Sequence, residues 1–186
     1  LVALPNVATS ESDIRANAEL LVRMLGKRGI AATILETPGA PVRGHGERRV
    51  AGARRTLLFY AHFDGQPVGP ESAWRSPPFE PVLRMGRAED GAAAVPWSEA
   101  TYPLPDEARI YARSSSDDKG PIVAMLAALD ALDAAKVPLS ANLKFFLEGE
   151  EEAGSPNLAR TLATHRGLLG SDLWIFGDGP IDPRGL

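Results

Sequence analysis

Three short apolar runs, each followed at once by ionisable residues, constrain most strongly what this chain can fold into. The runs cover residues 56–61, 143–147 and 173–176. They lead into His62 and Asp64, into the acidic stretch 148–152, and into Asp178. A short, continuously apolar run is typical of a strand that is covered on both faces. We therefore expect a buried sheet with charged residues at the ends of its strands.

Helix signals lie around and between these runs. Ser10 and Asp13 form a capping pattern that precedes an apolar face at helical spacing. That face consists of Ile14, Ala18, Leu21 and Leu25. Pro121 and Pro156 each suit the first turn of a further helix. Strands that alternate with helices predict an α/β fold, namely a three-layer αβα sandwich with a largely parallel mixed sheet.

Four other segments complete the predicted organisation. Residues 30–35 and 109–113 are short strand candidates. Residues 37–49 are rich in Pro, Gly and Arg and are interpreted as a loop or turn. The Pro-rich stretch 69–106 is expected to form a long excursion with at most one hairpin. Long ordered loops in compact domains are often functional.

Composition excludes several classes of function. Lys and Arg number 20 against 24 Asp and Glu, so the basic surplus of a nucleic-acid reader is missing. No apolar run reaches the roughly 18 residues that a membrane span needs. Cys is absent and only three His occur, so a metal site must rely mainly on carboxylates. Of these three, His45 and His165 are interpreted as surface residues, which leaves His62.

The strand ends and one helix start predict a common site. In open α/β sheets the site lies beyond the carboxyl ends of the strands, where parallel pairing brings these segments together. The expected cluster contains His62, Asp64, Asp117, Asp118, Glu150, Glu151, Glu152 and Asp178. Carboxylates this close repel one another unless they take up protons or bind a cation. An imidazole among carboxylates suits zinc, manganese or cobalt better than calcium, and two such ions would share a bridging carboxylate.

Each piece also has a structural interpretation when it is taken alone. His62 could be a structural histidine. Asp64 favours the ligand interpretation instead, because it stands on the same face of an extended segment and could hold a metal-bound imidazole by its other nitrogen. Residues 117–118 could cap a helix. Residues 150–152 could form a solvated turn, and Asp178 stands between two glycines. Their occurrence together at successive strand ends favours a functional site.

Four motifs, in this order, resemble those of a known enzyme family. They are residues 62–68 (HFDGQPV), 74–79 (WRSPPF), 116–120 (SDDKG) and 148–155 (EGEEEAGS). The set is similar to the dizinc metallopeptidase family of glutamate carboxypeptidase, acetylornithine deacetylase, succinyl-diaminopimelate desuccinylase and carnosine dipeptidase. Asp178 together with the 148–152 motif resembles the dipeptidase and aminopeptidase branch more than the desuccinylase branch.

The resemblance implies a role for each matching residue. His62 and Asp178 match ligands of the first zinc ion, Asp117 matches the bridging aspartate, Glu152 matches a ligand of the second zinc ion, Asp64 matches the partner of the ligand histidine, and Glu151 matches the general base. It also implies a cis peptide between Asp117 and Asp118. The family closes its second metal site with a His near its C-terminus and inserts a lid or dimerisation domain, and nothing here matches either. We therefore expect residues 1–186 to be the N-terminal portion of a catalytic domain, whose full-length protein forms a homodimer through the missing domain.

The implied reaction is hydrolysis of an amide bond in a small peptide or an N-acyl amino acid by a water that two metal ions activate. The default location is the cytoplasm, with neither a nucleic acid nor a membrane as partner. Two alternatives stay open. A magnesium-dependent phosphohydrolase would use Asp117, Asp118 and Lys119. A catalytically incomplete fragment would bind metal without turnover.

Overall fold

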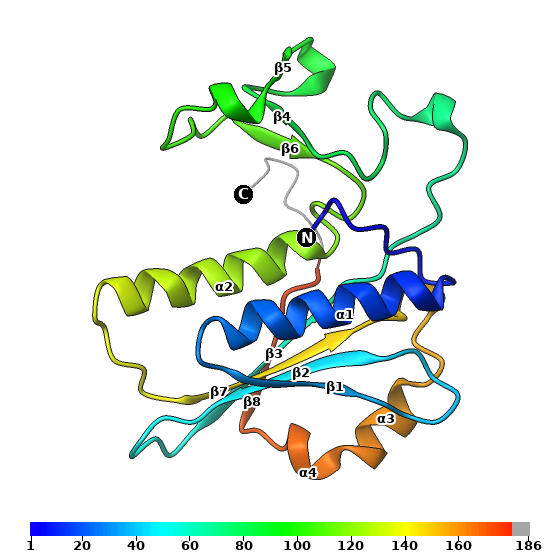
Figure 1. Cartoon of the computed structure of the whole chain (residues 1–186). Helices are drawn as coiled ribbons and strands as arrows, with labels where there is room; N and C mark the ends of the chain where they lie inside the picture. Colours follow the sequence, from blue (N-terminus) through cyan, green and yellow to red (C-terminus); the bar gives the residue numbers. More distant parts are fainter. Residues whose placement is uncertain (180–186) are drawn as a thin grey trace.

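The computed structural model describes residues 1–179, which form the elements labelled in Figure 1. The helices are α1 (Glu11–Gly26), α2 (Lys119–Ala134), α3 (Leu158–Thr164) and α4 (Arg166–Leu169). The strands are β1 (Ala31–Leu35), β2 (Arg43–Arg48), β3 (Thr56–His62), β4 (Val82–Arg84), β5 (Ala94–Val95), β6 (Arg109–Tyr111), β7 (Asn142–Glu148) and β8 (Leu173–Phe176). Short 3-10 turns are η1 (Glu71–Ala73), η2 (Ala88–Asp90), η3 (Trp97–Glu99) and η4 (Glu151–Ala153).

The main sheet is mixed and has the strand order β1-β2-β7-β3-β8. Strands β7, β3 and β8 are parallel, whereas β1 and β2 pair antiparallel on one side of them. Helices α1 and α2 cover one face of this sheet, and α3 and α4 cover the other (Figure 1). This arrangement confirms the predicted α/β class with its three layers. The parallel strands are the ones that the three apolar runs predict.

Helix α1 begins and packs as its sequence pattern predicts. The side chain of Ser10 accepts a hydrogen bond from the backbone N–H of Asp13 at 3.4 Å, which satisfies one free donor of the first turn. The predicted apolar face of this helix is buried against the sheet together with the apolar face of α2. Burial of this face, rather than helix propensity alone, is what holds such a helix in place.

Strand β2 corrects the interpretation of residues 37–49 as a loop or turn. Its sequence RGHGER carries no apolar alternation, yet it pairs with β1 and β7 on its two sides. A Cβ added at Gly46 would lie 2.9 Å from Ile30 Cγ2 and 3.1 Å from Leu25 Cδ1. Glycine suits this position because the side chains of Ile30 and of Leu25 in α1 lie directly against the strand. His45 is correspondingly buried, at 4% exposure, and is not a surface residue.

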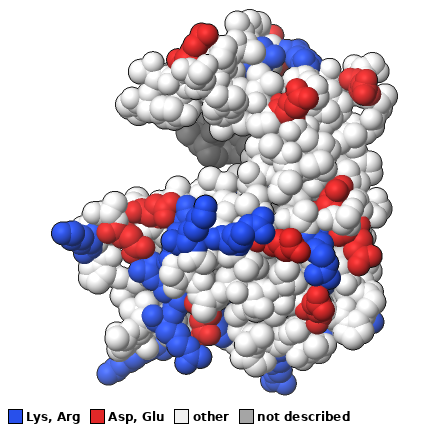
Figure 2. All heavy atoms as spheres, in the orientation of Figure 1, with Lys and Arg blue, Asp and Glu red and all other residues white. Residues whose placement is uncertain are grey.

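The excursion after β3 forms a second small sheet. Strand β4 pairs antiparallel with β5 and with β6, in the order β5-β4-β6. The β4–β5 pair is the single hairpin that the sequence allowed within residues 69–106. Figure 2 shows the surface hollowed between this part and the main body, with acidic and basic side chains interspersed on that face. None of the helices described combines the length and the apolar character that a membrane crossing requires.

Candidate metal centre

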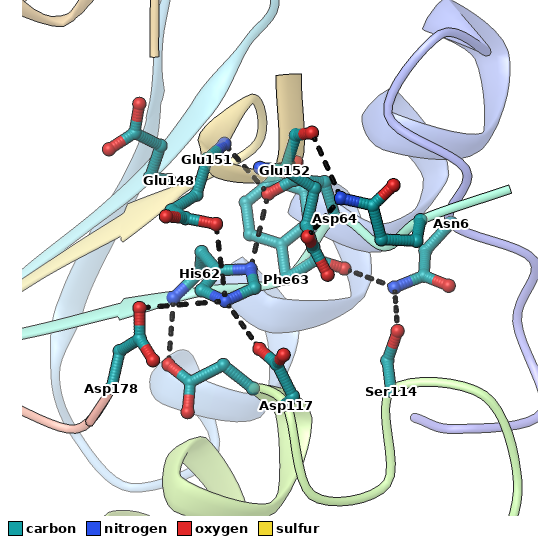
Figure 3. Close-up of polar contacts among 12 residues, drawn as sticks. Asn6, His62, Phe63, Asp64, Ser114, Asp117, Glu148, Glu151, Glu152 and Asp178 are labelled. Carbon is teal, nitrogen blue, oxygen red and sulfur yellow. Dashed lines mark hydrogen bonds and ion pairs between the residues drawn. The ribbon is translucent and has the colours of Figure 1, made fainter. Parts of the chain in front are cut away.

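His62, the last residue of β3, is the centre of a group of carboxylates. Its side chain is buried, and its Nε2 lies 2.8 Å from Asp117 Oδ1. The same nitrogen lies 3.8 Å from Glu151 Oε2 and 3.9 Å from Asp178 Oδ2 (Figure 3). These three acids come from separate segments, namely the residues before α2, the turn η4, and the residues after β8.

The strand register explains why these residues meet. Tyr60 of β3 pairs with Phe176 of β8, so His62 and Asp178 each lie two residues beyond the same pair. On the other side of β3, His62 pairs with Glu148, the last residue of β7. The three parallel strands therefore end together, and the residues that follow them share one edge of the sheet. The convergence predicted from the apolar runs is present in the structure.

Asp64 fixes the turn that carries the two glutamates. This carboxylate is fully buried and accepts the backbone N–H of Glu151 at 3.2 Å and that of Glu152 at 2.9 Å. Its Oδ1 also lies 3.4 Å from His62 Nδ1, an ionic contact without hydrogen-bond alignment. Asp64 thus contacts both the imidazole and the backbone that positions Glu151.

Asp118 and Lys119 are both buried, and of the two only Asp118 lines the pocket that contains Asp117 and Asp178. The Asp117–Asp118 peptide is cis, as the resemblance implies. Asp118 Oδ2 accepts the backbone N–H of His62 at 3.0 Å, and burial raises the pKa of Asp118 to about 6. Lys119 is fully buried and donates to backbone carbonyl groups of residues 1 and 4. The set of two aspartates and a lysine that a phosphohydrolase would use is therefore not assembled in one pocket.

The group carries more negative charge than its own residues neutralise. Burial disfavours the charged imidazole, but the carboxylates of Asp64, Asp118 and Glu151 outweigh this and raise the pKa of His62 to about 9. Burial, followed by the nearby acids, including Asp178, raises the pKa of Glu151 despite the opposing effect of His62. Among residues 1–179, no Lys or Arg side chain lies within 4.0 Å of Asp117, Glu151 or Asp178.

This donor set fits a divalent cation. His62, Glu151 and Asp178 each offer one ligand atom, and these atoms all lie within 4.8 Å of one another. Imidazole nitrogen and carboxylate oxygen atoms are both protein ligands of zinc. A cation would also offset the repulsion among the acids, which adds to burial in raising the pKa of Glu151.

Comparison with known proteins identifies the family. Residues 58–182 match the model of peptidase family M20/M25/M40. The chain belongs to this family. A curated relative, the Cys-Gly metallodipeptidase dug1 of Schizosaccharomyces pombe, is 29% identical over 106 residues, which cover 57% of this chain and 18% of that protein.

Solved structures of M20 proteins share the fold of this chain. The crystal structure of an M20 family metallo-carboxypeptidase from Sulfolobus solfataricus matches 99% of this chain and 37% of its own, with 29% identity and a TM-score of 0.73. Human carnosine dipeptidase 1 matches 96% of this chain and 36% of its own, with 21% identity and a TM-score of 0.73. The M20 chain described here therefore spans well under half the length of these relatives.

Glu152 lies differently from the other predicted ligands of this M20 chain. Its carboxylate accepts a hydrogen bond from Gln66 Nε2 at 2.7 Å and is not part of the group around His62. The role of Glu152 as a ligand of a second metal therefore stays a prediction. Sequence reasoning did not single out Gln66, although this polar residue stands two positions after Asp64 in the first motif.

Glu150 is turned away from His62, which corrects its placement in the expected carboxylate cluster. It joins a second buried group, which we term the Arg43 cluster, made of Arg43, Tyr60, Glu148, Glu150 and Asn157. Arg43 of β2 forms ion pairs with Glu148 at 3.6 Å and, at a shorter distance, with Glu150. Tyr60 donates to Glu148 at 2.8 Å, and Asn157 Nδ2 donates to Glu150 at 2.9 Å. Sequence reasoning missed this group because its cation lies in a strand without an apolar pattern.

Proposed function

We propose that this chain forms the metal-binding portion of a zinc metallopeptidase that hydrolyses amide bonds of small peptides. The observation that carries this proposal is the convergence of three carboxylates on the buried imidazole of His62. The names of M20 relatives agree with it, since they include a Cys-Gly metallodipeptidase and a carnosine dipeptidase. N-acyl amino acids offer the same scissile bond and form the second substrate class.

We assign the metal ligands from both the motifs and the geometry. His62 and Asp178 would hold the first zinc ion, Asp117 would be a ligand of both ions, and Glu152 would be a ligand of the second. When bound, the ions supply a Lewis acid that polarises the scissile carbonyl and makes a water molecule more acidic. The buried carboxylate of Asp64 contacts both His62 and the backbone of η4, and it would thereby hold the proposed ligand and the proposed base in position.

Glu151 is the proposed general base. Its side chain is 36% exposed, so a substrate or a water can reach it, and its carboxylate faces His62. Its pKa is raised above that of an ordinary glutamate and is therefore closer to neutral pH. This suits a group that first accepts and then returns a proton. In this proposal Glu151 takes a proton from the attacking water and passes it to the leaving amine.

The relatives of known structure are much longer than this chain. The solved M20 structures are matched over 37% and 36% of their length. We propose that residues 1–186 are the N-terminal portion of a catalytic domain, and that a His ligand of the second ion and a lid domain belong to other parts of such a protein. Homodimer formation and a cytoplasmic location stay predictions.

The test combines metal analysis with a peptidase assay. The purified chain, and any longer protein that contains it, are loaded with zinc and incubated with Cys-Gly and with carnosine, and released amino acids are measured. We expect hydrolysis that a chelator abolishes and zinc restores. Strict dependence on magnesium with release of phosphate from phosphoesters would contradict the proposal. Zinc uptake without hydrolysis by any form would favour the catalytically incomplete fragment.

A further inference from the structure

A segment outside the proposed ligand set reaches the metal centre from the start of the chain. Residues 1–9, which we term the N-terminal strap, run beside the loop that follows β3. Val7 forms a parallel bridge with Gly65. The backbone N–H of Gly65 donates to the carbonyl of Asn6 at 2.8 Å. The strap is thus hydrogen-bonded to the loop directly after Asp64.

The side chain of Asn6 joins two segments that carry proposed ligands. Asn6 is fully buried, and its Nδ2 donates to the Phe63 carbonyl at 2.6 Å and to Ser114 Oγ at 2.9 Å (Figure 3). Phe63 directly follows His62, and Ser114 stands three residues before Asp117. One amide group therefore connects the loop after β3 with the segment that leads into α2.

The amide of Asn6 can adopt only one orientation between Phe63 and Ser114, and there is little free space around it. A backbone carbonyl only accepts, so the amide of Asn6 must direct its NH2 group at Phe63, and both of its donor hydrogens are then used. Ser114 has φ 58°, a left-handed conformation that is uncommon for a residue with a side chain. A Cβ added at Gly65 would lie 2.5 Å from Ser114 Oγ. The two segments are therefore in contact at this point.

Lys119 adds a second connection from the strap. Its Nζ donates to the carbonyl of Leu4 at 2.9 Å and to that of Leu1 at 3.1 Å. Lys119 stands two residues after Asp117, and its backbone N–H donates to the carbonyl of Ser114 at 3.1 Å. The segment from Ser114 to Lys119 is thus held to the strap at both of its ends.

We propose that Asn6 is a positioning residue of the metal centre. By joining the carbonyl next to His62 to Ser114, it sets the spacing between the His62 and Asp117 side chains, which lie 2.8 Å apart. Groups that orient metal ligands in this way typically change metal affinity about 10- to 100-fold when they are removed. This inference rests on the proposed function, because it presupposes that His62 and Asp117 bind metal.

Asn17 provides a matched control for a purely structural role. It is also fully buried, and its Nδ2 also makes two hydrogen bonds, to the carbonyl of Pro5 at 2.7 Å and to that of Asp13 at 2.8 Å. In both asparagines Oδ1 has no hydrogen-bond partner among residues 1–179. Asn17 therefore holds the strap to α1 without contacting either ligand segment. Its replacement removes equivalent bonds from a place that does not set ligand spacing.

The experiment measures metal binding and stability on the same proteins. Zinc affinity is determined by competition with a chromophoric chelator, Co²⁺ is used as a spectroscopic probe of ligand geometry, and urea unfolding reports stability. We expect Asn6→Ala to weaken zinc binding about 10- to 100-fold and to alter the visible Co²⁺ spectrum. We expect Asn17→Ala to lower stability to a similar extent while it keeps zinc affinity within about twofold and leaves the spectrum unchanged.

A milder variant covers the case in which Asn6→Ala does not fold. Ser114→Ala keeps the bond from Asn6 to Phe63 and removes the connection between the segments, so we expect a loss of zinc affinity smaller than that of Asn6→Ala and a shifted Co²⁺ spectrum. Wild-type affinity and spectrum in Ser114→Ala, or equal affinities in the Asn6 and Asn17 variants, would overturn the positioning role. A wild-type protein that binds neither zinc nor Co²⁺ would instead overturn the proposed function and, with it, this inference.

Discussion

Two groups of acids lie at the ends of the same strands, one buried and one partly exposed, and they differ in how their charge is balanced. In the Arg43 cluster, the guanidinium of Arg43 and the hydroxyl and amide donors of Tyr60 and Asn157 serve Glu148 and Glu150. In the metal centre, three carboxylates share a single imidazole. Both groups draw on the acidic stretch 148–152.

The difference shows how neighbouring glutamates acquire different tasks. Glu148 and Glu150 are buried and both pair with Arg43, whose single positive charge offsets part of theirs, while burial raises the pKa of Glu148. Glu151 is partly exposed, and its backbone is held by Asp64 while its side chain is left for chemistry. A buried acid with its own cation needs no metal, whereas a group of acids without one provides a cation site.

The largest expected effect separates the two groups by activity. If the chain has the proposed peptidase activity, replacing Glu151 by Gln should lower turnover about 100- to 10,000-fold, because the proposed proton acceptor is lost while its shape is kept. Zinc content should stay at the wild-type level. The assay is Cys-Gly hydrolysis together with metal analysis of the purified variant. Loss of zinc would mean that Glu151 is a ligand, as its position beside His62 and Asp178 also allows.

The second largest expected effect is a loss of stability when the Arg43 cluster loses its cation, a change that does not touch the metal centre. Arg43→Met leaves Glu148 and Glu150 buried without their cation, and removal of one partner from such a group costs about 3–5 kcal/mol in the free energy of unfolding. Urea denaturation measures this loss. Adding Glu148→Gln and Glu150→Gln to the same variant should recover most of it, because no uncompensated charge then remains. A single-variant loss below about 1 kcal/mol would show that Arg43 does not neutralise the cluster.

Metal binding should stabilise the chain through the metal centre alone. Free zinc at about 100 times its dissociation constant should raise the free energy of unfolding by about 2.7 kcal/mol, and a chelator should remove this increment. Thermal unfolding with and without chelator measures it. The increment should shrink in Asp178→Asn and keep its size in Arg43→Met. An unchanged increment in Asp178→Asn would remove Asp178 from the ligand set.

The smallest effect concerns a single hydrogen bond of the Arg43 cluster. Asn157→Ala removes the donor that meets Glu150 at 2.9 Å and also the exposed Oδ1 that accepts from Arg160. We expect a loss of about 1–2 kcal/mol because the acceptor on Glu150 is charged and the site is partly exposed. Urea denaturation again provides the measurement. In a Glu150→Gln background the same substitution should cost less. An equal cost in both backgrounds would show that the bond does not depend on the charge of Glu150.

Much of the fold could be predicted from the sequence because local patterns and tertiary structure agree there. The apolar runs formed β3, β7 and β8, and the capped apolar face formed α1. Strand β2 could not be predicted, because its stability comes from pairing on both sides rather than from its own residues. Its glycine at position 46 reflects close packing by α1, which only the assembled layers reveal.

The candidate site, like the fold, has features that the sequence predicts and features that only tertiary contacts decide. The sequence by itself determined which segments would end at the sheet edge, since continuous apolar runs dictate parallel strands and their ends, and it thereby brought His62 and Asp178 together. Only the tertiary structure decided that Glu150 faces Arg43 while Glu151 faces His62. Strand β2 delivers the cation for Glu150, and Asp64 holds the backbone of Glu151. Contacts between residues that are distant along the chain select one of several adjacent, chemically identical side chains, and no local pattern can encode that choice.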